Sequence, residues 1–179
     1  MEERIRTLGS LHTRHFAAHL DLVRLRDGTT TERMRIEHPV AAAILACPEP
    51  GRVLLVRQHR YALGCETLEI PAGKTDPGET ALACAVRELR EETGFEAASL
   101  APLIRFAPAI GYSDEVIEIF LASGVRRVSD EVDGREIAGV EILPLAEALR
   151  LVREGVILDA KTIIGLQALR GAPEGPPGS

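Results

Sequence analysis

Four glutamates lie close together in the middle of the chain, in a segment bounded by two glycines. The segment reads Gly73, five residues, Glu79, seven residues, and then Arg87-Glu88-Leu89-Arg90-Glu91-Glu92-Thr93-Gly94-Phe95. Its periodicity predicts a helix over about residues 79–92, and Gly94 is a suitable end because glycine readily takes the left-handed conformation that terminates helices. Any fold of this chain must therefore contain a glutamate-rich helix that follows a loop beginning at Gly73.

The predicted helix carries apolar and acidic residues on adjacent flanks. At about 100° per residue, the stripe predicted to be buried consists of Leu82, Val86 and Leu89. Glu88, Glu91 and Glu92 fill the next flank, and like charges three or four residues apart destabilise a helix by about 0.2–0.5 kcal/mol per pair. Arg87 and Arg90 offset part of that repulsion. A divalent cation would make the carboxylates favourable as a group, and oxygen ligands suit Mg²⁺ or Mn²⁺.

The spacing of the whole segment is more specific than its acidity. It matches every fixed position of the signature G-x5-E-x7-R-E-U-x-E-E-x-G-U, where U is a bulky apolar residue. Such a match arises by chance on the order of 10⁻⁷ times in a chain of this length, so a merely solvated acidic helix face does not explain it. The chain resembles the Nudix hydrolases, and the resemblance extends over roughly residues 40–169.

Segments on both sides of this helix have the patterns of strands and amphipathic helices. Strands are predicted over residues 16–25, 30–37, 40–46, 53–58, 67–70, 100–106, 115–121 and 137–143. Helices are predicted over 145–153 and 160–170. This order favours an α/β (α+β) fold with a mixed β-sheet sandwiched between helices. The Nudix fold implied by the resemblance has that architecture, with an N-terminal antiparallel β-hairpin or sheet added.

Composition and charge exclude several classes of protein. The net charge of −6 leaves no broad basic surface, so a nucleic acid polymer is not expected as partner. No window approaches the roughly 18 apolar residues of a membrane span. Three cysteines far apart, an odd number without a Cys-x-x-Cys pair, suit a reducing compartment, so the protein is expected in the cytoplasm.

Three parts are expected along the chain. Residues 1–39 form an N-terminal β-hairpin region, 40–170 form the Nudix hydrolase domain, and the Pro/Gly-rich tail 171–179 is expected to be disordered. Related enzymes are dimers whose N-terminal strands complete the partner's nucleotide site. The resemblance therefore implies a homodimer in which Arg33, Arg35 or His38 contacts a small-molecule nucleotide across the interface.

The resemblance also implies an activity and a cofactor. Nudix hydrolases cleave the pyrophosphate bond of a nucleoside diphosphate linked to another group, and they use one to three Mg²⁺ or Mn²⁺ ions. The implied metal ligands are the carbonyl of Ala72 and the carboxylates of Glu88, Glu91 and Glu92. The positions implied to shape the loop and helix are Gly73, Glu79, Arg87 and Gly94.

The flanking residues indicate a substrate class. Residues 56–61, 66–73 and 155–162 resemble ADP-ribose pyrophosphatases and related nucleotide-sugar hydrolases. This implies ADP-ribose as substrate, with Arg60 on a substrate phosphate and Gly111 and Glu115 lining the substrate site. The subgroup usually has a proline where this chain has Ile110, so ADP-glucose, GDP-mannose and dinucleotides are alternatives. A nucleotide-sensing domain without activity is a further alternative, which the intact signature disfavours.

Three glutamates are candidates for the catalytic base. ADP-ribose pyrophosphatases often take it from an acidic loop before the last strand, which here spans residues 129–136. Glu136 is the first choice because it lies nearest the strand, and Glu131 is the second. Glu91, on the helix itself, is the third candidate. Phe16 and Tyr112 are candidates for stacking on the nucleobase.

Overall fold

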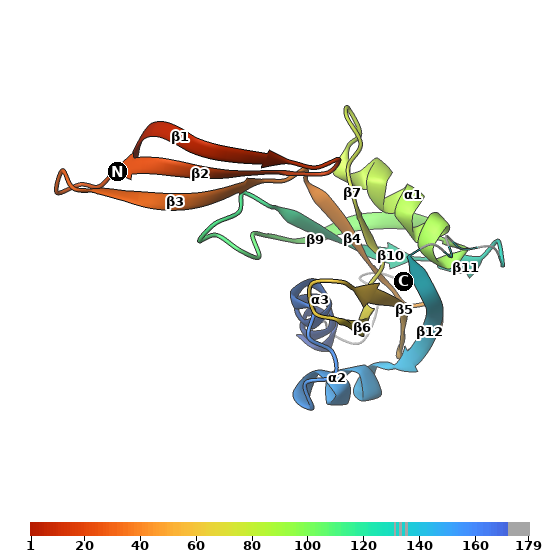
Figure 1. Ribbon diagram of the computed structural model, residues 1–179. Helices are drawn as coiled ribbons and strands as arrows, with labels where there is room; N and C mark the ends of the chain where they lie inside the picture. Colours follow the sequence, from red (N-terminus) through yellow and green to blue (C-terminus); the bar gives the residue numbers. More distant parts are fainter. Residues whose placement is uncertain (131, 133, 135, 172–179) are drawn as a thin grey trace.

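The N-terminal region forms a separate antiparallel sheet, with strand order β1-β2-β3. The computed structural model describes residues 1–130, 132, 134 and 136–171. The strands of this sheet are β1 (Glu3–His12), β2 (Ala17–Arg24) and β3 (Thr30–Glu37). Figure 1 shows the sheet extending sideways from the rest of the molecule. The hairpin of β2 and β3 was predicted, whereas β1 was not, because all its residues are exposed and polar residues occupy both faces.

Two further sheets form the centre of the molecule. The larger has the order β7-β4-β10-β9, and its β4–β10 pair is parallel while its other pairs are antiparallel. Its strands are β4 (Ala41–Ala46), β7 (Ala72–Lys74), β9 (Ser99–Phe106) and β10 (Ile117–Ser123). The smaller is antiparallel, with the order β12-β5-β6. Its strands are β5 (Arg52–Arg60), β6 (Cys65–Glu69) and β12 (Ile137–Pro144). The short strands β8 (Phe95–Glu96) and β11 (Arg126–Arg127) pair with each other.

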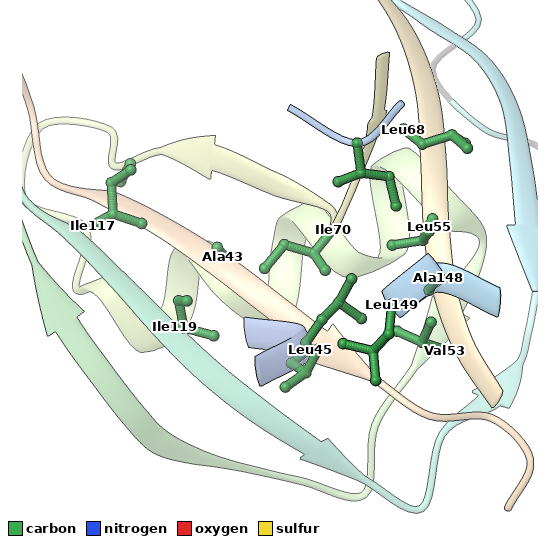
Figure 2. Packing of buried hydrophobic residues seen from close by; sticks show 13 residues of the cluster. Ala43, Leu45, Val53, Leu55, Leu68, Ile70, Ile117, Ile119, Ala148 and Leu149 are labelled. Atoms are coloured by element: carbon green, nitrogen blue, oxygen red, sulfur yellow. The ribbon is translucent and has the colours of Figure 1, made fainter. Parts of the chain in front are cut away.

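Helices cover both sides of these strands, as Figure 1 shows. They are α1 (Ala81–Thr93), α2 (Leu145–Arg153) and α3 (Ala160–Gly171). Alternate residues of β4 point to opposite layers: Ala42 and Ile44 belong to the cluster under α1, and Ala43 and Leu45 belong to the cluster under α2 and α3. Figure 2 shows the second cluster, to which Leu45 of β4 and Leu149 of α2 both belong. The predicted mixed sheet between helices is therefore confirmed.

The buried face of α1 differs from the predicted stripe. Leu82 and Val86 are 46% and 55% exposed, so two of the three predicted positions were wrong. The buried residues of the helix are Cys84, Ala85, Leu89 and Thr93. Small side chains on this face let the helix pack closely on β4 and β7. Because this face lies next to the flank that carries the glutamates, acidic side chains of α1 come to lie beside β7: Glu92 accepts from the N–H of Ala72.

Three of the remaining predictions concern membrane spans, the C-terminal tail and one candidate for the base. No helix in the part of the chain that the structure describes is long and apolar enough to cross a membrane. The predicted tail lies at residues 171–179, and positions 172–179 are outside the described residues. The same holds for Glu131, the second candidate for the base.

Candidate active site

A cavity of about 1300 Å³ lies where the N-terminal sheet, the loop after β7, the end of α1 and the start of α3 meet. Its walls combine segments that are far apart in sequence. The predicted site residues that line it are Arg60, Ala72, Gly73, Glu79, Arg87, Glu88, Glu92, Glu115 and Glu136. The fold therefore brings most of the predicted constellation to one cavity, although no spacing rule connects its parts.

Arg87 connects helix α1 to the loop that precedes it. Its Nε and Nη2 donate to the two carboxylate oxygens of Glu79, at 3.0 and 2.9 Å, and Nη2 also donates to the carbonyl of Lys74 at 3.2 Å. The hydrogen bond from Arg87 holds the pKa of Glu79 at about 2. Glu79 in turn accepts from the backbone N–H of Asp76 at 3.0 Å. This pair fixes the loop against the helix, which is the role expected for Glu79 and Arg87.

Glycines stand at both ends of the segment. A Cβ atom at Gly73 would overlap the carboxylate of Glu88 where it now lies, so a larger residue at position 73 would displace that side chain from its place at the cavity wall. At the other end, Gly94 has a φ of 72° and its N–H donates to the carbonyl of Arg90, which terminates α1. Thr80 caps the start of the helix by accepting from the N–H of Ala83.

Glu88 and Glu92 face the cavity from α1, and burial changes their acidity. Burial raises the pKa of Glu88. Burial also raises the pKa of Glu92 to about 8, although the N–H of Ala72 donates to its Oε2 at 2.9 Å and the charge of Lys161 acts in the opposite direction. Glu91 differs from both, since its side chain is 53% exposed, lies outside the cavity lining and accepts from Arg87 at 3.1 Å.

The donor set at this wall fits a hard divalent cation. Within the described ranges, no three His, Cys, Asp or Glu side chains are already gathered as metal ligands. Glu88 instead accepts from Arg87 at 2.7 Å, and Glu92 accepts from the Ala72 amide. Yet the two carboxylates share one cavity wall with the backbone of Ala72 and have raised pKa values, so a bound cation would relieve the cost of their burial.

The other predicted substrate residues lie in different surroundings. Arg60 lines the cavity and is bound to Glu69, and Glu115 lines it within 3.5 Å of His38 Nδ1. Gly111 lies outside the cavity lining, in the turn before β10. Ile110, at the position where the subgroup usually has proline, points into solvent.

Of the N-terminal residues predicted to contact the nucleotide, His38 lines the cavity of its own chain and Arg33 and Arg35 do not. Arg33 pairs with Glu2 at 2.8 Å and Arg35 pairs with Asp21 at 3.1 Å, so both lie away from the cavity of their own chain. The N-terminal residues that do line the cavity are Arg14, His15, His38 and Pro39. Sequence reasoning missed Arg14 and His15 because they lie in the turn after the unpredicted strand β1.

A smaller hollow of about 190 Å³ lies beside the cavity. Phe16, His38, Tyr112 and Glu115 are among the residues that line it. The rings of Phe16 and His38 are stacked, with centroids 5.9 Å apart and an angle of 8° between their planes, and the Lys74 ammonium lies 5.5 Å from the Phe16 ring. The two aromatic residues proposed for base stacking thus lie together.

Four buried polar residues of the cavity wall were given no role from the sequence. They are Gln58, Thr67, Glu69 and Lys161. A carboxylate in the otherwise apolar end of a strand, as in Thr67-Leu68-Glu69-Ile70, is a signal that could have found Glu69, because charged residues are rarely buried without a partner.

Comparisons with known proteins identify the family. The family model of the NUDIX domain matches residues 37–163. The chain is 36% identical to the methanol dehydrogenase activator of Bacillus methanolicus, over 94% of this chain and 92% of that protein. It is 37% identical to the ADP-ribose pyrophosphatase of Bacillus subtilis, over 83% and 81%. A crystal structure of an ADP compounds hydrolase has the same fold, with a TM-score of 0.81 and 24% identity over 94% and 92% of the two chains. The chain therefore belongs to the Nudix family, and the prediction of a Nudix hydrolase is confirmed.

Proposed function

We propose that this Nudix hydrolase cleaves the pyrophosphate bond of ADP-ribose and releases AMP and ribose 5-phosphate. The cavity is the observation that carries the proposal, because it combines acidic groups on α1 with the cationic side chains of Arg60 and Lys74. Ligand cavities usually measure about 300–1,000 Å³, so a cavity of about 1300 Å³ has room for a nucleotide joined to a second sugar. The similarity to an ADP-ribose pyrophosphatase supports the same substrate.

The acidic wall is proposed to hold one to three Mg²⁺ or Mn²⁺ ions. Nudix hydrolases need divalent metal ions, and here Glu88 and Glu92 are the principal ligands. Glu91 and the carbonyl of Ala72 complete the set. When bound, such an ion offsets the negative charge of the pyrophosphate and makes water more acidic.

The protein's own residues position the substrate and move the proton. Arg60 is proposed to donate to a substrate phosphate, and Glu115 lines the same cavity. Gly111 is proposed to contact the substrate as well. Glu136, which also lines the cavity, is the proposed base. It accepts a proton from the water whose oxygen forms the new bond to phosphorus, while the bridging P–O bond breaks and its oxygen leaves with the second phosphate.

The N-terminal region, residues 1–39, is proposed to form a homodimer with the same region of a second copy. Strand β1 is an edge strand, and an exposed strand edge is ready to pair with another chain. Its side chains include the exposed Ile5, Leu8 and Leu11. In that dimer Arg33 or Arg35 would approach the partner's cavity. Light scattering of the purified protein at several concentrations tests the dimer, which should have twice the mass of one chain.

The Nudix domain is proposed to span residues 40–170, and the protein is proposed to work in the cytoplasm. Cys47, Cys65 and Cys84 are free thiols in the structure, as expected in a reducing compartment.

A substrate panel tests the proposed activity. Purified protein should release AMP from ADP-ribose with Mg²⁺ or Mn²⁺ and lose that activity in EDTA. The panel should also contain ADP-glucose, GDP-mannose, NADH and diadenosine polyphosphates, ranked by kcat/KM. A higher kcat/KM for GDP-mannose would replace ADP-ribose by the alternative substrate. Tight binding of ADP-ribose without turnover would indicate a nucleotide-sensing domain.

A further inference from the structure

An ion cluster outside the Nudix signature holds Arg60 in one orientation at the cavity wall. The Nε and Nη2 atoms of Arg60 donate to the two carboxylate oxygens of Glu69, at 2.7 and 2.6 Å. Such a two-point contact fixes the plane of the guanidinium as well as its position. Glu69 is only 2% exposed, so water cannot replace Arg60 as its partner. The orientation of Arg60 therefore depends on where the Glu69 carboxylate lies.

The Glu69 carboxylate is itself held from two other directions. Thr67 Oγ1 donates to Oε1 at 2.6 Å, and the ammonium of Lys161 donates to Oε2. Lys161 comes from the start of α3, 92 positions further along the chain, and it also lies 3.1 Å from Asp159 Oδ2. Buried carboxylates with several such partners are well fixed, because each lost partner would leave a charge unpaired.

The start of α3 is also attached to Ile70, the residue that follows strand β6. Asp159 Oδ2 accepts from the N–H of Thr162 at 2.9 Å and from its hydroxyl at 2.5 Å. The Thr162 hydroxyl oxygen accepts from the N–H of Ile70 at 2.8 Å. Lys161 thus sits on a helix end that is locked to the strand carrying Glu69, so the distance between the two side chains is set by the fold.

Arg60 lines the cavity, and Glu69 occupies only one edge of its guanidinium. Within the part of the chain that the structure describes, Nη1 of Arg60 has no hydrogen-bond partner, whereas Nε and Nη2 are both occupied. The Arg60 side chain is 41% exposed and lines the cavity. Two positive charges, on Arg60 and Lys161, balance two negative charges, on Glu69 and Asp159, so the cluster presents a donor without presenting an unpaired carboxylate to an anionic substrate.

We propose that Glu69 and Lys161 are positioning residues, which orient Arg60 so that its free edge meets a substrate phosphate. The inference rests on the proposed function, in which Arg60 contacts the pyrophosphate. An arginine already fixed in its binding geometry loses little side-chain freedom when the substrate arrives. The residues that fix it therefore contribute to substrate binding without touching the substrate.

A second ion pair on the same strand provides a matched control. Arg57 on β5 donates through both Nε and Nη2 to Oε1 of Glu141 on β12, with the Nε bond at 2.9 Å. Neither residue lines the cavity. If arginine–glutamate pairs on this strand only stabilise the sheet, Glu69→Gln and Glu141→Gln should affect catalysis alike.

The experiment compares the two variants in ADP-ribose hydrolysis, with thermal unfolding measured alongside. Glu69→Gln should raise KM by roughly tenfold, the effect of losing one hydrogen bond to a charged group, and lower kcat by less. Lys161→Met should do the same, and Lys161→Arg should restore part of the loss. Glu141→Gln should leave KM unchanged. Equal KM values for Glu69→Gln and Glu141→Gln would overturn the proposal.

A double-mutant cycle separates positioning from a general structural effect. If Glu69 acts through Arg60, Arg60→Ala combined with Glu69→Gln should have the same KM as Arg60→Ala alone. If the double variant instead raises KM by the product of the two single effects, Glu69 acts independently of Arg60 and the proposal is overturned. Should Glu69→Gln fail to fold, Thr67→Val removes one hydrogen bond to Glu69 and keeps all four charges, and it should raise KM by a smaller factor. An unchanged KM in that variant would then count against positioning.

The wild-type measurement distinguishes the two possible failures. A wild-type enzyme that hydrolyses a different nucleotide contradicts the proposed substrate, and the same cycle is then run with that nucleotide. A wild-type enzyme that hydrolyses ADP-ribose with a KM that does not change in Arg60→Ala keeps the proposed activity, and it contradicts the phosphate contact of Arg60 together with the positioning inference built on it.

Discussion

The N-terminal sheet and the sheet beside the cavity are built in opposite ways. Every residue of β1 is exposed, whereas every residue of β4 is buried between two helical layers. The N-terminal sheet is held by backbone pairing and by exposed cross-strand ion pairs such as Arg24–Glu3. The cavity glutamates, in contrast, stand on a helix fixed by close packing. The difference teaches that the proposed metal ligands stand on the packed core, while the exposed sheet leaves an edge open for the proposed contact with a second copy.

The largest expected effect is the loss of activity when a cavity glutamate is neutralised. Glu92→Gln should lower kcat roughly 10²–10³-fold, the size seen when one group that stabilises transition-state charge is removed. The reason is that Glu92 is a proposed metal ligand in a buried wall. Glu3→Gln on β1 should leave kcat unchanged. Steady-state kinetics with ADP-ribose and excess Mg²⁺ measure both.

Glu91→Gln sharpens the same prediction within one helix. Its side chain is half exposed and lies outside the cavity lining, so a smaller loss of kcat is expected than for Glu92→Gln. Equal losses of kcat in Glu91→Gln and Glu92→Gln would show that the exposed Glu91 is as important for catalysis as the buried Glu92. That result would favour Glu91 as the base.

The next largest effect is a difference in stability between substitutions in the core and substitutions on the edge strand β1. Leu54→Ala, in β5 under α1, should lower the free energy of unfolding by about 2–5 kcal/mol, because Leu54 is fully buried and the change leaves a cavity. Leu11→Ala on β1 should change it by less than about 0.5 kcal/mol, because Leu11 is 67% exposed. Urea unfolding measures both. A loss at Leu11 comparable to that at Leu54 would break the comparison and show that a second copy buries β1.

The sequence predicted the parts of the fold that local rules determine. Helix α1 lies within two residues of its predicted bounds, because Gly94 provides a strong C-terminal stop. Its buried stripe was predicted wrongly, since side-chain size suggested Leu82 and Val86 while the actual contact surface uses Cys84 and Ala85. A helix that packs closely on a sheet favours small residues, and only the tertiary contact reveals that choice.

The site was predictable to the extent that it is local in sequence. Glu79, Arg87, Glu88 and Glu92 meet because one loop and one helix carry them. The cluster around Arg60 has no such spacing, because Glu69 and Lys161 come from β6 and α3 and meet only when the fold is complete. Arg14 and His15 were missed for the related reason that β1 has no amphipathic pattern.

Low pH should lower the stability of the protein through the protonation of Glu69 in the cavity wall. Burial alone would raise the pKa of Glu69, but hydrogen bonds from Arg60 and the charge of Lys161 outweigh it and hold the pKa at about 2, below the usual 4.5. A lowered folded-state pKa contributes stability that is fully present above pH 4.5 and is lost as the pH falls toward 2. The contribution is on the order of 3 kcal/mol.

Urea unfolding at a series of pH values measures this contribution. Between pH 4.5 and 2, Glu69→Gln should lose less stability than the wild-type chain, because it has no carboxyl at this position to titrate. Parallel curves for the wild-type chain and Glu69→Gln would contradict the prediction.

The smallest expected effect concerns Arg33. It tests whether the N-terminal sheet contributes to the cavity of its own chain or to the cavity of a second copy. The Arg33–Glu2 pair is exposed, so Arg33→Ala should change the stability little. Arg24→Ala, which breaks the similarly exposed Arg24–Glu3 pair on the same sheet, is the matched control. If each cavity is completed by its own Arg14 and His15, the two variants should have the same KM for ADP-ribose. A KM raised only in Arg33→Ala would mean that Arg33 reaches the partner's nucleotide, and that the exposed sheet is part of a second copy's active site.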